Sequence, residues 1–369
     1  MLKLIISDTC SAQFDMMKPG FTFALQLVML ALFGFSCSAG SHPLPEQNPD
    51  KKYCIAFYNV ENLFDAKDDP EVDDAEFTPE GQNHWTDEKY QTKLHHIAKV
   101  IASMNDGRGP DVVGLSEIEN AGVLKDLIAT SELKPLHYSF LHEESPDKRG
   151  IDVCMLYKEK SFRILGHQML TVDISSLDDK PTRSIMMVQG IAGKKDTLYF
   201  FLNHWPSRRG GTEQSEPKRE IAAKVLRTAV DSLLLLRPNA GMVIMGDFND
   251  NPPDHSITEV LKAQRTIDPA TKNSLYDAAS VFKWKEGEGS EFYRGSWSRF
   301  IQFIFTTSLI KEQLGSDGLF HDIYIYKPDW LLIADPAYQQ MVPFRTYDED
   351  SKEMGYSDHL PVYVLLKIR

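Results

Sequence analysis

The sequence predicts a single globular domain in which β-strands and α-helices alternate. The chain has 369 residues, 42% of them hydrophobic, which is enough to bury a large core. Short apolar runs such as residues 242–245 are typical of strands buried on both faces. Between residues 53 and 369 there is no internal repeat and no long linker rich in Pro or Gly, which favours one domain over two.

The first 52 residues differ in character from the rest. Met17-Lys18 opens a charged and then apolar stretch that runs through residues 21–35, as in a secretory signal, and translation is expected to begin at Met17. The apolar run is shorter than the roughly 20 residues of a bilayer span, which favours export over a permanent transmembrane helix. Residues 1–39 are therefore predicted to be an export signal, and residues 40–52 a polar tether.

Two routes of signal processing remain open. The segment Gly34-Phe35-Ser36-Cys37 resembles a loose bacterial lipoprotein box, which would place a lipid anchor on Cys37. Ordinary cleavage after Ala39 is the alternative, because Cys37 and Ala39 supply the small residues of such a site. The expected location is the periplasm, the outer membrane as a lipoprotein, or the medium. Cys54 and Cys154 lie in strand-like runs and are expected to be buried free thiols.

Polar side chains follow the buried run at residues 242–245. Asp247 and Asn249 are two residues apart, so the two-residue period of a strand would place both side chains on the same face at its carboxyl end. A carboxylate beside a carboxamide can hold a water and a substrate oxygen. The alternative is an ordinary turn, since Asp, Asn and Pro are common turn residues.

Two further predicted strands also end in polar residues. Asn59 and Glu61 close the strand at residues 53–60, and Glu117 follows the strand at residues 111–116. Open sheets place their sites beyond the carboxyl ends of strands. We therefore expect Asn59, Glu117 and Asp247 to meet.

A local basic segment follows the predicted strand at residues 197–202. It contains His204, Arg208 and Arg209, and the planar guanidinium group matches the oxygens of a phosphate. The alternatives are a structural histidine and arginines paired with Glu213 and Glu216. The formal net charge of −13 argues against a broad nucleic-acid footprint, so polyanion binding would be local.

The remaining elements are predicted from pattern. A helix should begin near Thr86 or Asp87, and a second should cover residues 221–236. Further strands are expected at residues 151–157 and 300–305. The last motif, Asp358-His359, precedes a terminal strand.

Five motifs occur in order: FYNVEN, GLSEIEN, NHWPSRRGG, GDFNDNP and YSDHLPV. In this order they resemble the endonuclease/exonuclease/phosphatase superfamily of metal-dependent phosphoesterases, which includes pancreatic-type deoxyribonuclease. The resemblance covers nearly everything from residue 53 to the end of the chain. It implies an α+β fold, a four-layer α/β/β/α sandwich of two mixed β-sheets flanked by helices.

The resemblance also implies roles for site residues. Glu117 resembles the principal metal ligand, with Glu61 and Asp358 on the metal side. Carboxylate oxygens suit Mg²⁺ or Mn²⁺. Asn59, Arg208 and Arg209 are expected to contact substrate phosphate. The implied catalytic residues are His204, Asp247, Asn249 and His359.

One position departs from the family pattern. The family normally carries an aspartate a few residues after a tryptophan, where it orients the catalytic histidine, but here Ile301 stands at that place. A histidine without this partner has a less favoured tautomer and a less stabilised imidazolium ion. Glu119 is a candidate substitute if its side chain reaches the site.

These features predict an exported phosphodiester hydrolase that uses Mg²⁺ or Mn²⁺ and is a monomer. Nucleic acid is the favoured substrate, and a phospholipid or sphingolipid head group is the alternative. A second alternative is a surface or periplasmic binding protein that kept the fold and lost efficient chemistry through the change at Ile301.

Overall fold

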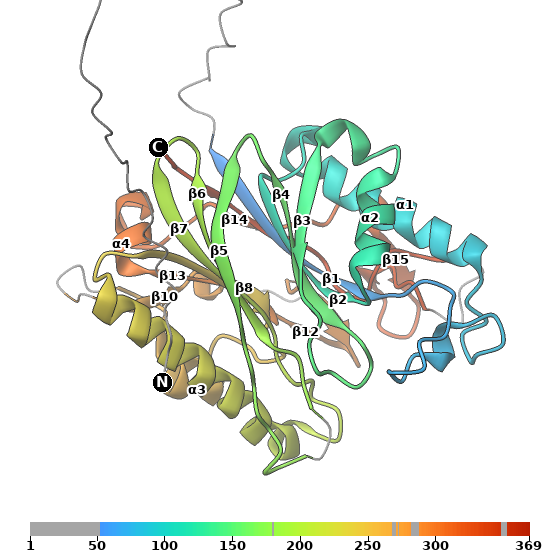
Figure 1. The fold of residues 1–369 in the computed structure, drawn as a ribbon. Helices are drawn as coiled ribbons and strands as arrows, with labels where there is room; N and C mark the ends of the chain where they lie inside the picture. Colours follow the sequence, from blue (N-terminus) through green and yellow to red (C-terminus); the bar gives the residue numbers. More distant parts are fainter. Residues whose placement is uncertain (1–51, 179–180, 268–270, 272, 282–287, 348–352) are drawn as a thin grey trace, which may run out of the picture. The chain divides into compact units, whose positions relative to one another are not determined.

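The computed structural model describes residues 52–369 except residues 179–180, 268–270, 272, 282–287 and 348–352 (Figure 1). Contacts group Pro49–Arg369 into one compact unit. The predicted export signal, Cys37 and all of the tether except Lys52 lie outside the described residues. Among the helices that the structure does describe, none combines the length and apolarity needed to cross a membrane.

Two mixed β-sheets form the centre of the fold. The six-stranded sheet has, in spatial order, β14 (Ile323–Ile325), β17 (Val362–Leu366), β1 (Tyr53–Leu63), β2 (Val112–Ile118), β4 (Asp152–Lys158) and β3 (Tyr138–His142). The seven-stranded sheet has β5 (Phe162–Leu170), β6 (Ile185–Ala192), β7 (Asp196–His204), β8 (Gly241–Asp247), β13 (Ile301–Thr306), β10 (Leu275–Asp277) and β9 (Ala263–Gln264). Strands β1 and β2 pair in parallel, as do β7 and β8, so the polar residues near the carboxyl ends of these strands gather at one end of each sheet.

Helices and hairpins complete the fold. The α-helices are α1 (Asp87–Gly107), α2 (Ala121–Ala129), α3 (Thr212–Leu236) and α4 (Thr307–Ile310). Two small hairpins pair β11 (Glu291–Tyr293) with β12 (Ser296–Ser298) and β15 (Leu332–Asp335) with β16 (Gln340–Pro343). The short helical turns are η1 (Ala75–Phe77), η2 (Lys134–Leu136), η3 (Ser256–Val260), η4 (Ala278–Val281), η5 (Lys311–Gln313) and η6 (Asp329–Leu331).

The buried side chains confirm the predicted four-layer sandwich. One cluster, including Phe57, Met155 and Phe200, fills the space between the two sheets. A second packs α1 and α2 on the outer face of the six-stranded sheet, and a third packs α3 on the outer face of the other, as Figure 1 shows. Successive strand residues point to opposite faces, so each sheet feeds two of these clusters.

Several local predictions agree with the structure, and two kinds of difference are informative. The strands predicted at residues 53–60 and 111–116 continue to Leu63 and Ile118, because a shift in register lets each strand resume pairing after its polar residues. Thr86 caps α1 by accepting a hydrogen bond from the Lys89 amide, and both Cys54 and Cys154 are buried free thiols. The helix predicted over residues 221–236 begins earlier, at Thr212. Its first turns were missed because they bury a charged residue, Arg219, against Asp250, so they carry no apolar periodicity.

Candidate active site

Three positions lie side by side where β7 and β8 end in the seven-stranded sheet. His204 at the end of β7 lies in register with Asp247 at the end of β8, and Asp247 lies opposite Ile301 at the start of β13. All three side chains are almost completely buried. Gly246 permits this arrangement, because a Cβ there would lie 2.2 Å from the carbonyl oxygen of Asn203. The Gly of the GDFN motif is therefore required by a close backbone approach.

In the six-stranded sheet, a β-bulge near the carboxyl end of β2 orients Glu117. The register of β2 against β4 shifts between Ser116 and Ile118, and Glu117 has a φ of 66°. A bulge turns one side chain away from the ordinary alternation, and a non-glycine residue with positive φ is strained. The Glu117 carboxylate is held by the Asn62 amide, which donates to Oε2 at 2.9 Å.

Asn59 joins the two sheets. Its Nδ2 donates to Asp247 Oδ2 at 2.9 Å and to Glu117 Oε1 at 3.2 Å. His204 Nε2 lies 3.7 Å from the same Glu117 oxygen. The expected meeting of Asn59, Glu117 and Asp247 is thus present in the structure, with His204 beside them.

Asn249 adjoins Asp247 for a different reason from the strand period. Strand β8 ends at Asp247, and Asn249 has a left-handed φ of 51°. Its backbone amide donates to Asp247 Oδ1 at 3.0 Å, and its side-chain amide donates to the Trp205 carbonyl at 3.0 Å. Both the turn and the paired side chains therefore occur, and the turn orients the pair.

The Asp358-His359 motif reaches the same place from the start of the last strand region. His359 Nε2 lies 3.6 Å from Asp247 Oδ2 and 3.8 Å from Asp358 Oδ1. Ser357 fixes the segment, because its hydroxyl donates to the Asn59 carbonyl at 2.7 Å and accepts from the His359 amide at 3.1 Å.

The two histidines differ in charge state. Burial disfavours the charged form of His359, but the carboxylates of Asp358, Asp247, Glu291 and Glu117 outweigh burial and raise its pKa to about 9. Burial lowers the pKa of His204 well below its usual range, and nearby guanidinium groups add to this effect. The surrounding carboxylates thus favour the imidazolium form of His359, whereas burial favours the neutral ring of His204.

Glu117 and Asp358 are suited to hold a divalent cation. Burial raises the pKa of Glu117, and the carboxylate of Asp358 raises it further, so positive charge at this place would relieve an electrostatic cost. Their oxygens are ligands that hard cations prefer. Glu61 is the third predicted ligand, and that role stays a prediction; its Oε1 accepts from Arg345 at 3.1 Å and its Oε2 from the Thr346 amide at 2.6 Å. These contacts make Glu61 an anchor for the segment that carries Arg345.

The two arginines after His204 have different surroundings. Arg208 Nε donates to the Asn249 carbonyl at 2.8 Å, and its Nη2 bonds Asp250 at 2.9 Å and Asp254. Arg208 therefore holds the loop after Asp247, and it pairs with neither Glu213 nor Glu216 among the described contacts. Arg209 is exposed, and its contact with phosphate remains a prediction.

Sequence reasoning missed two guanidinium groups. Arg345 bonds Glu61 and lies 3.5 Å from Asp358 Oδ2; it sits in an irregular segment that has no motif. Arg149 precedes the buried strand β4, and its charge stabilises the carboxylate form of Glu117. The dipeptide Arg149-Gly150 before a strand was the available signal.

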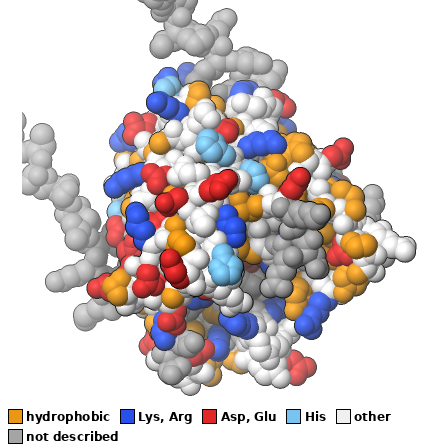
Figure 2. Space-filling view, turned by 90° about the vertical axis from the view of Figure 1, so that its right-hand side faces the viewer, with side chains coloured by type: hydrophobic (Ala, Val, Ile, Leu, Met, Phe, Trp, Pro, Cys, Tyr) orange, Lys and Arg blue, Asp and Glu red, His pale blue; other side chains and the backbone are white. Residues whose placement is uncertain are grey.

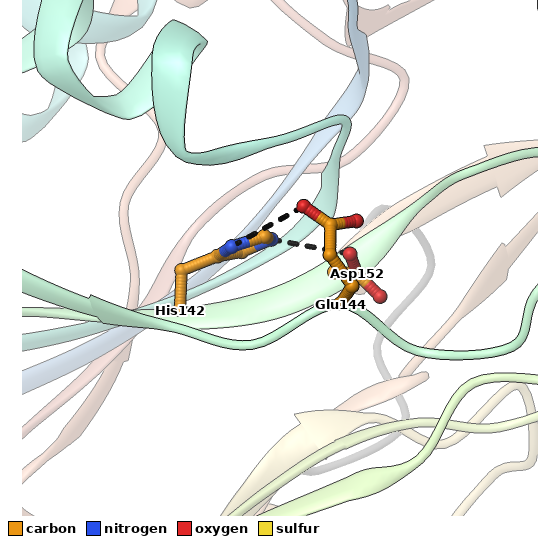
Figure 3. A group of neighbouring side chains, drawn as sticks. All are labelled: His142, Glu144 and Asp152. Atoms are coloured by element: carbon orange, nitrogen blue, oxygen red, sulfur yellow. Dashed lines mark hydrogen bonds and ion pairs between the residues drawn. The ribbon is translucent and has the colours of Figure 1, made fainter. Parts of the chain in front are cut away.

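A group of three side chains fixes the loop that carries Arg149. His142 Nε2 lies 3.1 Å from Asp152 and its Nδ1 3.8 Å from Glu144, so both ring nitrogens face carboxylates (Figure 3). Asp152 also accepts a hydrogen bond from the Ser145 amide at 2.8 Å. Because each ring nitrogen faces a different carboxylate, the group ties β3 to β4 at the two ends of this loop.

The departure at Ile301 is buried in the core. Ile301 is 1% exposed and packs between the sheets. The candidate substitute Glu119 accepts a hydrogen bond from the Asp65 amide at 2.5 Å, and no contact with His359 is found among the described residues. Glu119 thus has a partner of its own at the end of β1.

Comparison with known proteins agrees with this geometry. Residues 54–368 match the model of the Endonuclease/Exonuclease/phosphatase family. The chain belongs to this family. It is accordingly a hydrolytic phosphoesterase of a class that depends on a divalent metal. No curated protein matches it.

Solved structures share the fold at low identity. Truncated Caenorhabditis elegans TDP2 has a TM-score of 0.51 and 13% identity, over 85% of this chain and 97% of that one. A mannosyl-6-phosphatase from Bacteroides thetaiotaomicron has a TM-score of 0.53 and 15% identity, over 85% and 99%. An endonuclease/exonuclease/phosphatase family protein from the same organism has a TM-score of 0.51 and 14% identity, over 86% and 97%.

Proposed function

We propose that this protein hydrolyses phosphodiesters with the help of Mg²⁺ or Mn²⁺. The observation that carries the proposal is the convergence of five motif residues: Asn59 bridges Glu117 and Asp247, and His359 and His204 lie within 3.7 Å of these carboxylates. Such a set can orient a water, hold a phosphate and oppose the charge of the transition state.

The proposed role of each residue follows from its charge and its hydrogen-bonding capacity. Asp247 accepts a proton from the attacking water, and Asn249 and Asn59 orient the water and a phosphoryl oxygen. The imidazolium of His359 stabilises negative charge on the phosphoryl oxygens, and the neutral ring of His204 donates a hydrogen bond. Water forms the new P–O bond as the ester P–O bond breaks, and the leaving oxygen takes up a proton.

A divalent cation would be held by Glu117 and Asp358. When bound, it supplies positive charge against the phosphoryl oxygens. Carboxylate oxygens suit either Mg²⁺ or Mn²⁺.

A cavity of about 350 Å³ beside Asp358 favours a nucleotide-like substrate. Its walls include Tyr293, Arg294 and Tyr338 from the β11–β12 and β15–β16 hairpins, and Arg345 from the segment after β16. Tyrosine rings and guanidinium planes stack on nucleobases, and this stacking tolerates any base. Acidic and basic side chains are mixed over the face in Figure 2, so that face carries no broad basic patch of the kind that a long duplex would need.

We further propose that the protein is exported and acts as a monomer. The support for export is the charged and apolar stretch at residues 17–39, with a lipid anchor at Cys37 or cleavage after Ala39 as the two routes.

Turnover by the purified protein tests the proposal. Single-stranded DNA, RNA, sphingomyelin and a simple phosphodiester are each incubated with Mg²⁺ or Mn²⁺, with Asp247→Asn as the inactive control. We expect metal-dependent cleavage, fastest on DNA or RNA. Cleavage of sphingomyelin alone would favour the lipid head group, and binding without turnover on any substrate would favour the binding protein.

A further inference from the structure

The His359 ring lacks a partner on one side. Its Nδ1 is buried and has no hydrogen-bond partner among the described residues, whereas Nε2 faces Asp247 and Asp358. Ile301 stands where the family normally has an orienting aspartate, and its side chain has no hydrogen-bond acceptor. A buried imidazole N–H without an acceptor is costly, so a carboxylate from elsewhere would stabilise both the tautomer and the ring position.

Glu291 is placed to supply that carboxylate. It is the first residue of β11 and forms an isolated antiparallel bridge with His359. Residues directly opposite in an antiparallel pair project side chains to the same face, with Cβ atoms about 4.5–5.5 Å apart. Accordingly, one oxygen of Glu291, one of Asp358 and a ring nitrogen of His359 lie within 4.8 Å of one another.

The backbone around Glu291 is anchored on both sides. The Ser290 carbonyl accepts from the Leu360 amide at 2.6 Å, and the Ser290 hydroxyl accepts from the Ile301 amide at 3.2 Å. The Ser290 amide itself donates to the Ser298 carbonyl at 2.8 Å. Strand β11 is thus fixed between the segment that carries His359 and the strand that carries Ile301.

We propose that Glu291 is the positioning residue of His359 and takes the role that Ile301 leaves open. The inference rests on the proposed hydrolytic function. Its carboxylate accepts the Nδ1–H hydrogen bond, directly after a side-chain rotation or through one water.

Three substitutions test the role, all in the full chain with saturating Mg²⁺. Glu291→Gln keeps the shape and removes the charge, and we expect kcat to fall about 10- to 100-fold with KM changed less than about twofold. Glu291→Asp should recover part of the loss. Added formate should partly rescue Glu291→Ala, with chloride as the salt control. Glu312→Gln, an exposed carboxylate, is the matched control and should behave as the wild type.

A second readout is independent of turnover. The ¹⁵N chemical shifts of the His359 ring report the tautomer, and they should change in Glu291→Gln but not in Glu312→Gln, with or without Mg²⁺. Unchanged shifts would overturn the inference even in an active enzyme. A large rise in the Mg²⁺ concentration needed for half-maximal activity, with unchanged ring shifts, would make Glu291 a cation ligand instead. If the wild type cleaves no substrate, the proposed function fails and the ring shifts alone decide the role of Glu291.

Discussion

Arg208→Ala should loosen the loop that carries Asp247 and Asn249. In the structure, the guanidinium group of Arg208 bonds the Asn249 carbonyl, Asp250 and Asp254, and it stacks 4.7 Å from the centre of the Phe300 ring. The substitution removes all four contacts at once. We therefore expect Arg208 to affect stability and turnover, and not substrate affinity alone.

The magnitude follows from which contacts are buried. Asp250 is 2% exposed, and after the substitution it keeps Arg219 and Ser256 as partners, so no buried charge is left alone. The pair with Asp254 is partly exposed and contributes about 0.5–1 kcal/mol. The charged hydrogen bond to Asp250 contributes about 1.5–3 kcal/mol before solvent screening. The free energy of unfolding should fall by about 2–3 kcal/mol.

Urea denaturation and steady-state kinetics measure the two effects. Arg209→Ala is the matched control, because Arg209 is the neighbouring residue and is exposed; it should leave the urea midpoint unchanged. Arg208→Lys keeps the charge but lacks the planar guanidinium fork that spans these acceptors, so its stability should fall between those of wild type and Arg208→Ala. If Arg208→Ala leaves stability unchanged and raises only KM, Arg208 contacts substrate and the loop argument is wrong.

Three further predictions follow from buried groups. Glu117→Gln should weaken Mg²⁺ binding measured by calorimetry while the protein stays folded; unchanged affinity would remove Glu117 from the metal site. Burial raises the pKa of Asp277 from 3.8 to about 7, so the folded state holds a proton that the unfolded state releases between these pH values, and stability from this group falls as pH rises. The free energy of unfolding of Asp277→Asn, measured by urea denaturation, should therefore rise relative to that of the wild type by up to about 4 kcal/mol as the pH increases from 4 to 8. A difference between the two proteins that does not depend on pH would contradict the assignment. Ile301→Asp places a second carboxylate opposite Asp247 in the core and should cost about 3–5 kcal/mol without raising kcat; faster turnover would show that His359 has no partner in the wild type.

Several features were predictable because their causes are local in the chain. The buried strand before Asp247 is marked by four consecutive apolar residues, and the start of α1 by the cap at Thr86. The order of five short motifs indicated the family and, through it, the sandwich. The first turns of α3 escaped detection, since Arg219 is buried by an ion pair that involves a residue far along the chain.

The sequence alone determined the buried strands that carry the motifs, the motif residues and the likeness to metal-dependent phosphoesterases. Only the tertiary structure decided the partners: Arg208 with Asp250, Glu61 with Arg345, and Glu291 opposite His359. These pairs depend on strand register, on the bulge at Glu117 and on the position of a small hairpin. Local composition does not reveal them, because it does not fix which residues of distant strands lie opposite one another. A shift of one residue in register would exchange every side chain between the two faces of a sheet.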